Sequence, residues 1–352
     1  MKWIRILLGV ILVVVFGFAS FVGIMTFIDE KPDEVMGIPI VNNQVRTVPL
    51  NEELIIATYN IGYGGLGQEQ DFFADGGTRS RAFSEEEIMS NLQSIVEVLD
   101  STNSNFMLLQ EVDKKASRSY KINQIEFIKN LYPNYSYSFG RNYNVKWVPV
   151  PLFNPMGSVE SGLLTLSKYN AYDANRFQFP GGEKWPVQIF ELDRCFVETR
   201  FNTIGDKDLI LINLHLSAFD EGGLIREQQL LYLKTHIENE HKKGNYIIVG
   251  GDWNHNLPGS DPSKFTTNEE WPFWLKDLPE NFYIEGFSWI IDNSTPTVRT
   301  LEKNYVEGEN FRAVIDGFYV SDNLEITGIS GTDTNFVYAD HNPVVMSFKL
   351  IQ

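Results

Sequence analysis

Residues 246–257 read YIIVGGDWNHNL, and the rest of the chain can be interpreted from this stretch. Its first four residues, Tyr246–Val249, form a continuous apolar run typical of a strand buried on both faces. We expect the two glycines that follow to turn the chain tightly and bring its backbone close to a ligand. Asp252, Asn254 and His255 come next, at the predicted strand end where layered α/β folds place binding groups. A buried strand ending in an ordinary Asx turn would give the same pattern.

The whole chain has the composition of a folded, acidic protein. Its 352 residues, 43% of them hydrophobic, suffice for one large domain or two ordinary ones, which argues against global disorder. The formal net charge of −17 gives little of the phosphate-backbone attraction that drives nonspecific nucleic-acid binding. Local binding of phosphate, directly or through a metal, stays open. Cys195 is the only cysteine, so an intrachain disulfide and a cysteine zinc cluster are excluded.

An apolar segment of 23 residues, Ile6–Ile28, is long enough to span a bilayer as a helix. Lys2 and Arg5 precede it and acidic residues follow it, so the positive-inside rule places the N-terminus in the cytoplasm and the remainder outside the cell. A cleaved signal peptide is the alternative, but its apolar core is usually shorter and no small-x-small cleavage site is evident. The expected segments are a cytoplasmic N-terminus at 1–5, a single-pass membrane anchor at 6–28, a linker at 29–52 and a folded domain at 53–352.

Strands and helices are predicted throughout that domain. Ser84 and Glu87 have the spacing of a capping box, and apolar residues at helical spacing continue to Leu99. Aromatic and proline-rich residues predict irregular loops around short strands at 135–160 and a long insert at 258–300. Further helices are predicted at 122–131 and 224–243, and strands at 54–60, 106–110, 161–167, 195–202, 209–216, 246–249, 313–320 and 343–350.

Polar side chains stand at or near the ends of several predicted strands. Each one alone has an ordinary explanation, such as a solvated loop residue or a turn before a proline. Together they predict a pocket with many oxygen ligands and two imidazoles, a donor set that suits Mg²⁺ or Mn²⁺. The residues are Asn60, Glu111, His215, Asp252, Asn254, Asp316, Asp340 and His341.

Six motifs carry these side chains in a fixed order: TYNIG, LLQEVD, NLHLS, GGDWNHN, VIDGFYVS and ADHNPV. This order resembles the endonuclease/exonuclease/phosphatase superfamily, which includes deoxyribonuclease-like nucleases, inositol polyphosphate phosphatases and neutral sphingomyelinases. The resemblance covers roughly residues 54–350. It implies an α/β fold, namely a four-layer α/β/β/α sandwich of two mainly antiparallel or mixed sheets behind the N-terminal transmembrane helix. It also implies a catalytic domain that hydrolyses phosphoester bonds at one end of the two sheets.

The resemblance implies a metal-binding group and a water-activating group. Glu111 would be the principal metal carboxylate, with Asn60 beside it. Asp340 would bind the metal directly or through water. Asp252 would orient or deprotonate the attacking water, and Asn254 would hold this water or a phosphoryl oxygen.

The resemblance also implies roles for both histidines. His341 would contact the phosphoryl group or transfer a proton, and Asp316 would fix its tautomer. Which of Asp252 and His341 acts as the base stays open. His215 resembles the phosphate-contacting histidine of the nuclease and sphingomyelinase branches. Members of the superfamily often carry a further tyrosine or asparagine between the glutamate and the first histidine motif; Tyr143 and Asn144 are the candidates here.

Four basic residues, Lys114, Lys115, Arg118 and Lys121, follow Glu111 closely. They are either a solvated face or a basic lip that guides an anionic substrate into an acidic protein.

Several functions remain open at this stage. The leading expectation is a metal-dependent phosphodiesterase on the outer membrane face, acting on nucleic acid or on a phospholipid head group. The anchor and the aromatic insert favour a lipid, since tryptophan and tyrosine prefer the membrane interface, although the same residues can pack a core. A phosphomonoesterase of the same superfamily and a non-catalytic binding protein with this fold are the alternatives.

Overall fold

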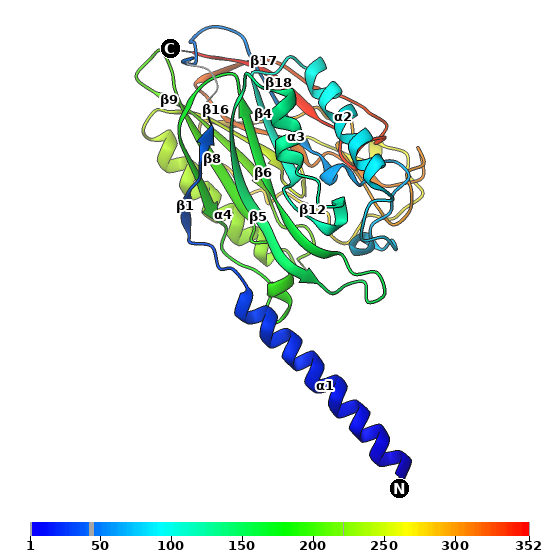
Figure 1. The fold of residues 1–352 in the computed structure, drawn as a ribbon. Coiled ribbons are helices and arrows are strands. Elements are labelled where there is room, and N and C mark those ends of the chain that lie inside the picture. The colour runs from blue at the N-terminus through cyan, green and yellow to red at the C-terminus, as the bar shows by residue number, and fades with distance from the viewer. Residues whose placement is uncertain (1, 42–45, 221, 352) are drawn as a thin grey trace.

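Two seven-stranded sheets packed face to face form the centre of the computed structural model (Figure 1). The structure describes residues 2–41, 46–220 and 222–351; residues 1, 42–45, 221 and 352 of the predicted segments lie outside the described residues. Helices α2 (Glu85–Ser101) and α3 (Gln124–Leu131) pack on one outer face, and α4 (Leu224–His241) packs on the other. The predicted four-layer sandwich is therefore confirmed.

The first sheet contains the stretch 246–257 from which the fold was read. Its strand order is β1-β7-β8-β9-β10-β16-β13; β9 and β10 run parallel and every other neighbouring pair is antiparallel. Its strands are β1 (Val35–Gly37), β7 (Ala171–Gln178), β8 (Cys195–Asn202), β9 (Asp208–His215), β10 (Tyr246–Asp252), β16 (Asp316–Ser321) and β13 (Phe287–Ile290).

The second sheet has the order β17-β18-β3-β4-β6-β5-β2, in which only β3 and β4 run parallel among the described strands. Its strands are β17 (Leu324–Gly331), β18 (Val344–Leu350), β3 (Leu54–Asn60), β4 (Phe106–Asp113), β6 (Gly157–Ser167), β5 (Ser136–Val148) and β2 (Ile40–Val41). Two small two-stranded sheets pair β11 (His255–Asn256) with β12 (Lys276–Asp277) and β14 (Val298–Arg299) with β15 (Arg312–Ala313). Short 3₁₀ helices are η1 (Gly62–Gly64), η2 (Phe73–Asp75), η3 (Ser117–Ser119), η4 (Val187–Phe190) and η5 (Pro262–Lys264).

Apolar side chains fill the space between the sheets because the central strands are apolar on both faces. Leu108 of β4, Leu211 of β9 and Ile248 of β10 belong to one buried cluster between the two layers. The predicted capping box begins α2: the Ser84 side chain accepts a hydrogen bond from the Glu87 amide at 3.1 Å. Glu87 in turn accepts from the amide of Phe83, one residue before the cap. These two hydrogen bonds fix the start of α2 on the outer face of the second sheet.

The prediction of irregular loops around short strands at 135–160 is wrong. β5 has 13 residues and pairs with the 11-residue β6 along most of its length. The strand was missed because small polar residues, not apolar ones, occupy buried positions at its start: Ser136 and Ser138 are both buried. The Ser138 hydroxyl lies 3.2 Å from that of Thr199 on the facing sheet, which satisfies both groups.

The glycine pair after Val249 does not turn the chain, contrary to the prediction, because β10 continues to Asp252. A Cβ on Gly250 would lie 2.7 Å from Phe318 Cδ1, and one on Gly251, whose φ is +145°, would lie 2.1 Å from the Leu214 carbonyl oxygen. The two glycines therefore permit close packing inside the sandwich, and the strand delivers Asp252 at its last position.

The predicted N-terminal helix is present as α1 (Lys2–Ile28), and it is long and apolar enough to cross a membrane. Its first part projects away from the domain, whereas Val22 and Met25 near its end are buried against it (Figure 1). The segment predicted as a linker also contributes structure: β1 is added to the edge of the first sheet and β2 to the edge of the second.

Candidate functional site

Three ionisable side chains are aligned on three neighbouring strands of the first sheet. Asp252, the last residue of β10, pairs with His215 of β9 on one side and with Asp316 of β16 on the other. All three side chains are buried. Strand pairing alone therefore gathers residues that are far apart in the sequence.

The second sheet brings Asn60, the last residue of β3, and Glu111 of β4 to the same end. The pairing of β4 with β6 is interrupted between Leu109 and Val112, so Glu111 sits in a bulge. Its φ of +55° lies in the left-handed region, which is unfavourable for a residue with a Cβ. Bulges of this kind redirect side chains beside functional sites.

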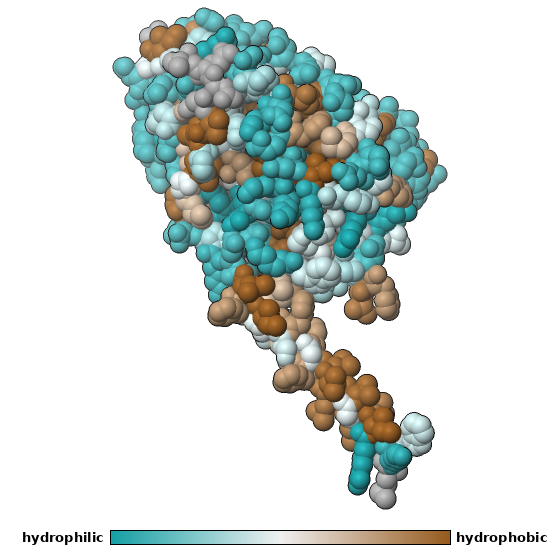
Figure 2. Space-filling model, viewed as in Figure 1, coloured by the Kyte–Doolittle hydropathy of each residue, from teal (hydrophilic) through white to brown (hydrophobic). Residues whose placement is uncertain are grey.

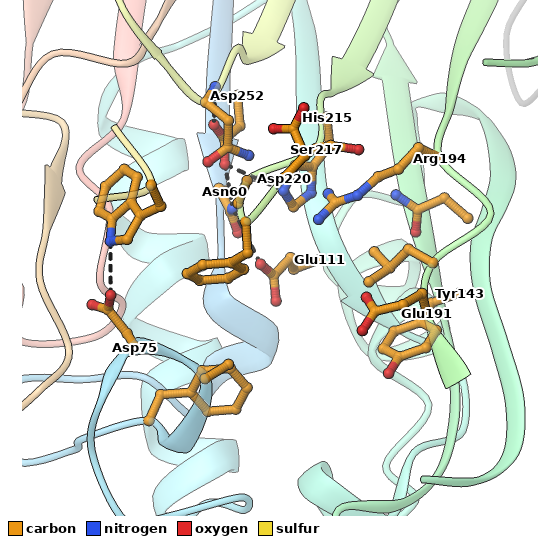
Figure 3. Close-up of a pocket in the computed structure, with 18 of the residues that line it drawn as sticks. Asn60, Asp75, Glu111, Tyr143, Glu191, Arg194, His215, Ser217, Asp220 and Asp252 are labelled. Atoms are coloured by element: carbon orange, nitrogen blue, oxygen red, sulfur yellow. Dashed lines mark hydrogen bonds and ion pairs between the residues drawn. The ribbon is translucent and has the colours of Figure 1, made fainter. Parts of the chain in front are cut away.

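The Asn60 amide joins the groups from the two sheets (Figure 3). Its Nδ2 donates to Asp252 Oδ2 at 3.0 Å and to Glu111 Oε1 at 3.4 Å, and it lies 3.4 Å from His341 Nε2. Its Oδ1 accepts from the Gly62 amide at 3.1 Å. The amide therefore bridges two carboxylates that would otherwise repel each other across the pocket.

His341 and Asp316 form the pair expected from the sequence. His341 Nδ1 lies 2.8 Å from Asp316 Oδ2, and both side chains are buried. Burial opposes the charge on the imidazole, but Asp316 and then Asp252 outweigh burial and raise the pKa of His341 to about 10. At neutral pH His341 is therefore an imidazolium, with Nε2–H 3.7 Å from Asp252 Oδ2.

In a simple ion pair the pKa of the histidine rises and that of the aspartate falls; the pKa values of His215 and Asp252 shift in the opposite directions. Burial, helped by the charges of Arg194 and His341, lowers the pKa of His215 well below its usual value, so this imidazole is neutral. Its Nε2 lies 3.4 Å from Asp252 Oδ2. Burial is also the main reason why the pKa of Asp252 rises to about 6, so the carboxylate can accept a proton near neutral pH.

Asp340 and Glu111 have the properties of ligands for a divalent cation. Asp340 Oδ1 is buried and has no hydrogen-bond partner. The pKa of Asp340 is raised to about 7, mainly because burial disfavours its charged form. The charge of His341 lowers this pKa, and the charge of Glu111 raises it further. Two carboxylates that destabilise each other fit a hard divalent cation. Asn60 could join them only after its amide turned over, since its nitrogen now faces the carboxylates.

A second group could hold a metal by distance alone, because ligand atoms of Asp252, Asp316 and His341 all lie within 4.8 Å of one another. However, His341 Nδ1 is already bonded to Asp316, and the raised pKa of His341 keeps a proton on each ring nitrogen. An imidazolium cannot ligate a metal. This group is therefore a poor metal site, and Glu111 and Asp340 remain the candidate metal ligands.

The remaining predicted residue, Asn254, is buried with its Nδ2 donating to the Leu216 carbonyl at 2.8 Å. Its backbone amide donates to Asp252 Oδ1 at 2.9 Å. His255 turns away, with Nδ1 2.6 Å from the Trp253 carbonyl oxygen. Seven of the eight predicted residues line one pocket of about 560 Å³, and Asp316 lies behind His341.

Two pocket donors were missed by the sequence interpretation. Arg194 Nη1 and Asn142 Nδ2 are buried atoms without a hydrogen-bond partner, and both residues line the pocket. Figure 3 shows Arg194 beside His215. Of the two candidates for the tyrosine or asparagine expected between Glu111 and the first histidine motif, Tyr143 lines the pocket and Asn144 does not. A register shift between Arg141 and Tyr143 turns Asn142 inward, and no sequence pattern signals such a bulge.

Neither a solvated face nor a basic lip, the two alternatives for the basic run, describes Arg118. It is buried in the pocket wall, where it forms a bidentate pair with Asp113 and lies 3.5 Å from Glu111 Oε2. Lys114 pairs with Glu160 at 3.0 Å. Arg118 thus positions the carboxylates, and it is the one residue of the basic run that lines the pocket.

The pocket is polar at its base and apolar toward its mouth. Its deep end holds the carboxylates, histidines and free donors already described. One part of its wall is formed by apolar side chains of residues 72–73, 148–156 and 187–192, namely Phe72, Phe73, Val148, Val150, Met156, Val187, Phe190 and Leu192. Phe219 and Phe273 add apolar surface from two other segments.

Comparisons with known proteins agree with this geometry. Residues 57–334 match the model of the endonuclease/exonuclease/phosphatase family. No curated protein matches this chain. The fold is similar to an endonuclease/exonuclease/phosphatase from Beutenbergia cavernae (TM-score 0.59, 15% identity, 86% of this chain and 72% of that chain) and a family protein from Leptotrichia buccalis (0.56, 13%, 84% and 99%). It is also similar to D. rerio TDP2 in complex with a single-strand DNA product (0.52, 13%, 85% and 100%).

Proposed function

Because the chain belongs to the endonuclease/exonuclease/phosphatase family, we propose that it is a divalent-metal-dependent phosphodiesterase anchored in a membrane. Family membership supports a phosphoester-hydrolysing enzyme in general. The finer proposal is carried by the base of the pocket, where Glu111 and the unpaired Asp340 oxygen face a free guanidinium donor of Arg194. Carboxylates for a cation and donors for an anion in one pocket are what phosphoester hydrolysis requires.

In this proposal Asp252 acts on the attacking water. Its Oδ1 is held by the Asn254 amide at 2.9 Å and its Oδ2 by Asn60 at 3.0 Å, which fixes the carboxylate plane. Burial keeps its pKa at about 6, so the ionised carboxylate can take the proton that water loses. The neighbouring imidazolium of His341 is already protonated and is therefore the donor to the departing oxygen.

Fixed donors stabilise the phosphoryl group as charge builds on its oxygens. Arg194 Nη1 and Asn142 Nδ2 have no other partner, so a bound phosphoryl oxygen would cost them no existing hydrogen bond. His215 lies beside Arg194 and is neutral, so it can contact the anion without adding charge. Glu111 and Asp340 would hold Mg²⁺ or Mn²⁺, which supplies charge neutralisation at the phosphoryl oxygens.

Hydrolysis of a soluble diester tests the proposal. With full-length protein in detergent, bis(p-nitrophenyl) phosphate should be cleaved with Mg²⁺ or Mn²⁺, and EDTA should abolish cleavage. The Arg194→Gln variant should raise KM roughly tenfold, because it loses a charged donor to the anion. Exclusive cleavage of p-nitrophenyl phosphate would replace the proposal by a phosphomonoesterase. The absence of metal-dependent cleavage of either ester would favour a binding protein.

The orientation of the anchor is part of the same proposal. Lys2 and Arg5 precede the apolar segment and Asp29 and Glu30 follow it, so the domain should face outside the cell. Protease added to intact cells should remove the domain and leave α1 in the membrane. A domain that is cleaved only after the membrane is permeabilised would reverse this orientation. A mature chain that lacks the first 28 residues would identify them as a signal sequence.

A further inference from the structure

The last two turns of α1 pack against the outer wall of the pocket. Val22 is buried there, and the ring of Phe21 stacks on that of Phe190 with centroids 5.9 Å apart. Trp185 Nε1 donates to Thr26 Oγ1 at 3.0 Å. Phe190 lines the pocket from the other side of the same segment. The end of the helix and the pocket therefore share a wall, and the helix fixes where the pocket opens.

This contact lies at the level where α1 would leave a bilayer. About 20 helical residues span the hydrocarbon core. Met25 is the twentieth residue of the apolar segment that begins at Ile6. Met25 is buried against the domain. Phe21 lies four residues earlier, which is about 6 Å along the helix, so the domain reaches the membrane interface beside α1.

Exposed apolar side chains continue from this contact around the pocket mouth. Figure 1 shows the loop between β5 and β6 at the same end of the domain as α1, and Figure 2 shows hydrophobic side chains at that loop and where α1 joins the domain. Val150 and Val187 also line the pocket. The residues, which we call the apolar rim, are Val150, Leu152, Phe153, Trp185 and Val187, with exposed fractions of 47%, 78%, 97%, 60% and 49%.

We propose that the apolar rim is seated in the bilayer surface and that the pocket takes its substrate, a phosphodiester lipid, directly from that bilayer. The inference rests on the proposed function. Tryptophan and phenylalanine favour the interface between water and hydrocarbon, and the packing of α1 holds the rim at that depth. The bilayer would therefore cover this group of exposed apolar side chains beside a membrane-length helix.

The polarity of the pocket matches such a substrate. A lipid phosphate would reach the donors at the base, while its chains would remain near apolar walls such as Val148 and Leu192. One water would add across one P–O ester bond, giving a phosphomonoester and an alcohol. Asp252 would take one proton from the water and His341 would give one to the departing oxygen; return of the proton from Asp252 to His341, whose Nε2 lies 3.7 Å from Asp252 Oδ2, would restore both groups. A nucleic acid fits less well, because the net charge is −17 and Arg118 is already paired with carboxylates.

The depth of the rim can be measured on full-length protein reconstituted in phosphatidylcholine vesicles. Phe153→Cys would carry an environment-sensitive fluorophore, and Ile204→Cys is the matched control. Ile204 is 70% exposed and lies in the turn from β8 to β9, at the opposite end of the sheet from His215. Burial raises the pKa of the native Cys195 thiol to about 11, so labelling is confined to the introduced cysteine.

Nitroxide-labelled lipids should quench the fluorophore at position 153 several-fold more than that at 204. Equal quenching at the two positions would overturn the proposal. A blue shift at 153 that depends on protein concentration, without quenching by lipid, would show that a second copy of the chain covers the rim and would also overturn it.

Substrate use provides the second measurement. Leu152 and Phe153 lie outside the pocket, so Leu152→Ser/Phe153→Ser should leave cleavage of bis(p-nitrophenyl) phosphate unchanged. Hydrolysis in vesicles of phosphatidylcholine, phosphatidylglycerol and sphingomyelin should fall at least about tenfold, while Ile204→Ser changes neither rate. Cleavage of the soluble diester without any vesicle lipid, or lipid cleavage indifferent to the rim, would overturn this inference alone. Failure to cleave the soluble diester as well would remove the proposed function.

Discussion

Replacing Glu111 by Gln should lower the rate of diester hydrolysis by roughly two to three orders of magnitude at limiting Mg²⁺. Glu111 stands in a bulge at the pocket base, its Oε1 is held by Asn60 at 3.4 Å, and its charge raises the pKa of Asp340. Removing this charge leaves a divalent cation with one carboxylate in place of two. Activity should be recorded against Mg²⁺ concentration, and Mg²⁺ affinity should be measured separately by calorimetry.

The same substitution should leave the midpoint of thermal unfolding unchanged or raise it slightly. Without bound metal, Glu111 repels Asp340, so its neutralisation relieves an unfavourable interaction. Glu160→Gln is the matched control, because Glu160 is a nearby carboxylate on β6 that pairs with Lys114 at 3.0 Å and does not line the pocket. Wild-type Mg²⁺ affinity in Glu111→Gln would show that this residue is not a metal ligand.

His341 and Asp316 should behave as a single unit. His341→Ala and Asp316→Ala are each expected to reduce the rate by about a thousandfold, since Asp316, which bonds His341 Nδ1 at 2.8 Å, is the group that contributes most to keeping His341 charged. The double variant should be little slower than His341→Ala. Rates for the four proteins at saturating metal, with circular dichroism as a folding check, provide the comparison.

Multiplicative losses in that cycle would separate the two residues. Asp316 would then act through the protein framework, where its backbone amide donates a hydrogen bond to Thr297 Oγ1 at 3.0 Å. Thr297→Val is a suitable control, because it alters this framework contact and leaves the carboxylate and the imidazole in place.

The sequence predicted most of the residues that the fold gathers in the candidate site, because strand ends carry them. Asp252 follows an apolar run whose burial on both faces fixes its register, and that register places it between His215 and Asp316. The capping box located the start of α2 for a similar reason: both of its hydrogen bonds are local. Where a few neighbouring residues determine the local geometry, the sequence pattern was sufficient to predict it.

The features that were missed depend on contacts across the fold. Asn142 turns inward at a bulge defined by pairing with β6, and Arg194 lies just before β8 without any motif around it. The buried position of Arg118 is set by Asp113 and Glu111 together, whereas Lys114, Lys115 and Lys121 of the same basic run are exposed. A local pattern therefore cannot reveal these residues, because their partners are brought near only by folding.

The two short strands after α1 have a practical consequence for a released form of the enzyme. β1 covers the open edge of β7, and β2 covers that of β5. Bare edges invite pairing with other chains and hence aggregation. Shedding by a protease within residues 29–34 would keep both edges covered, so the released domain would not pair with other chains through them. A cut after Val41 would strip them and leave a product prone to self-association.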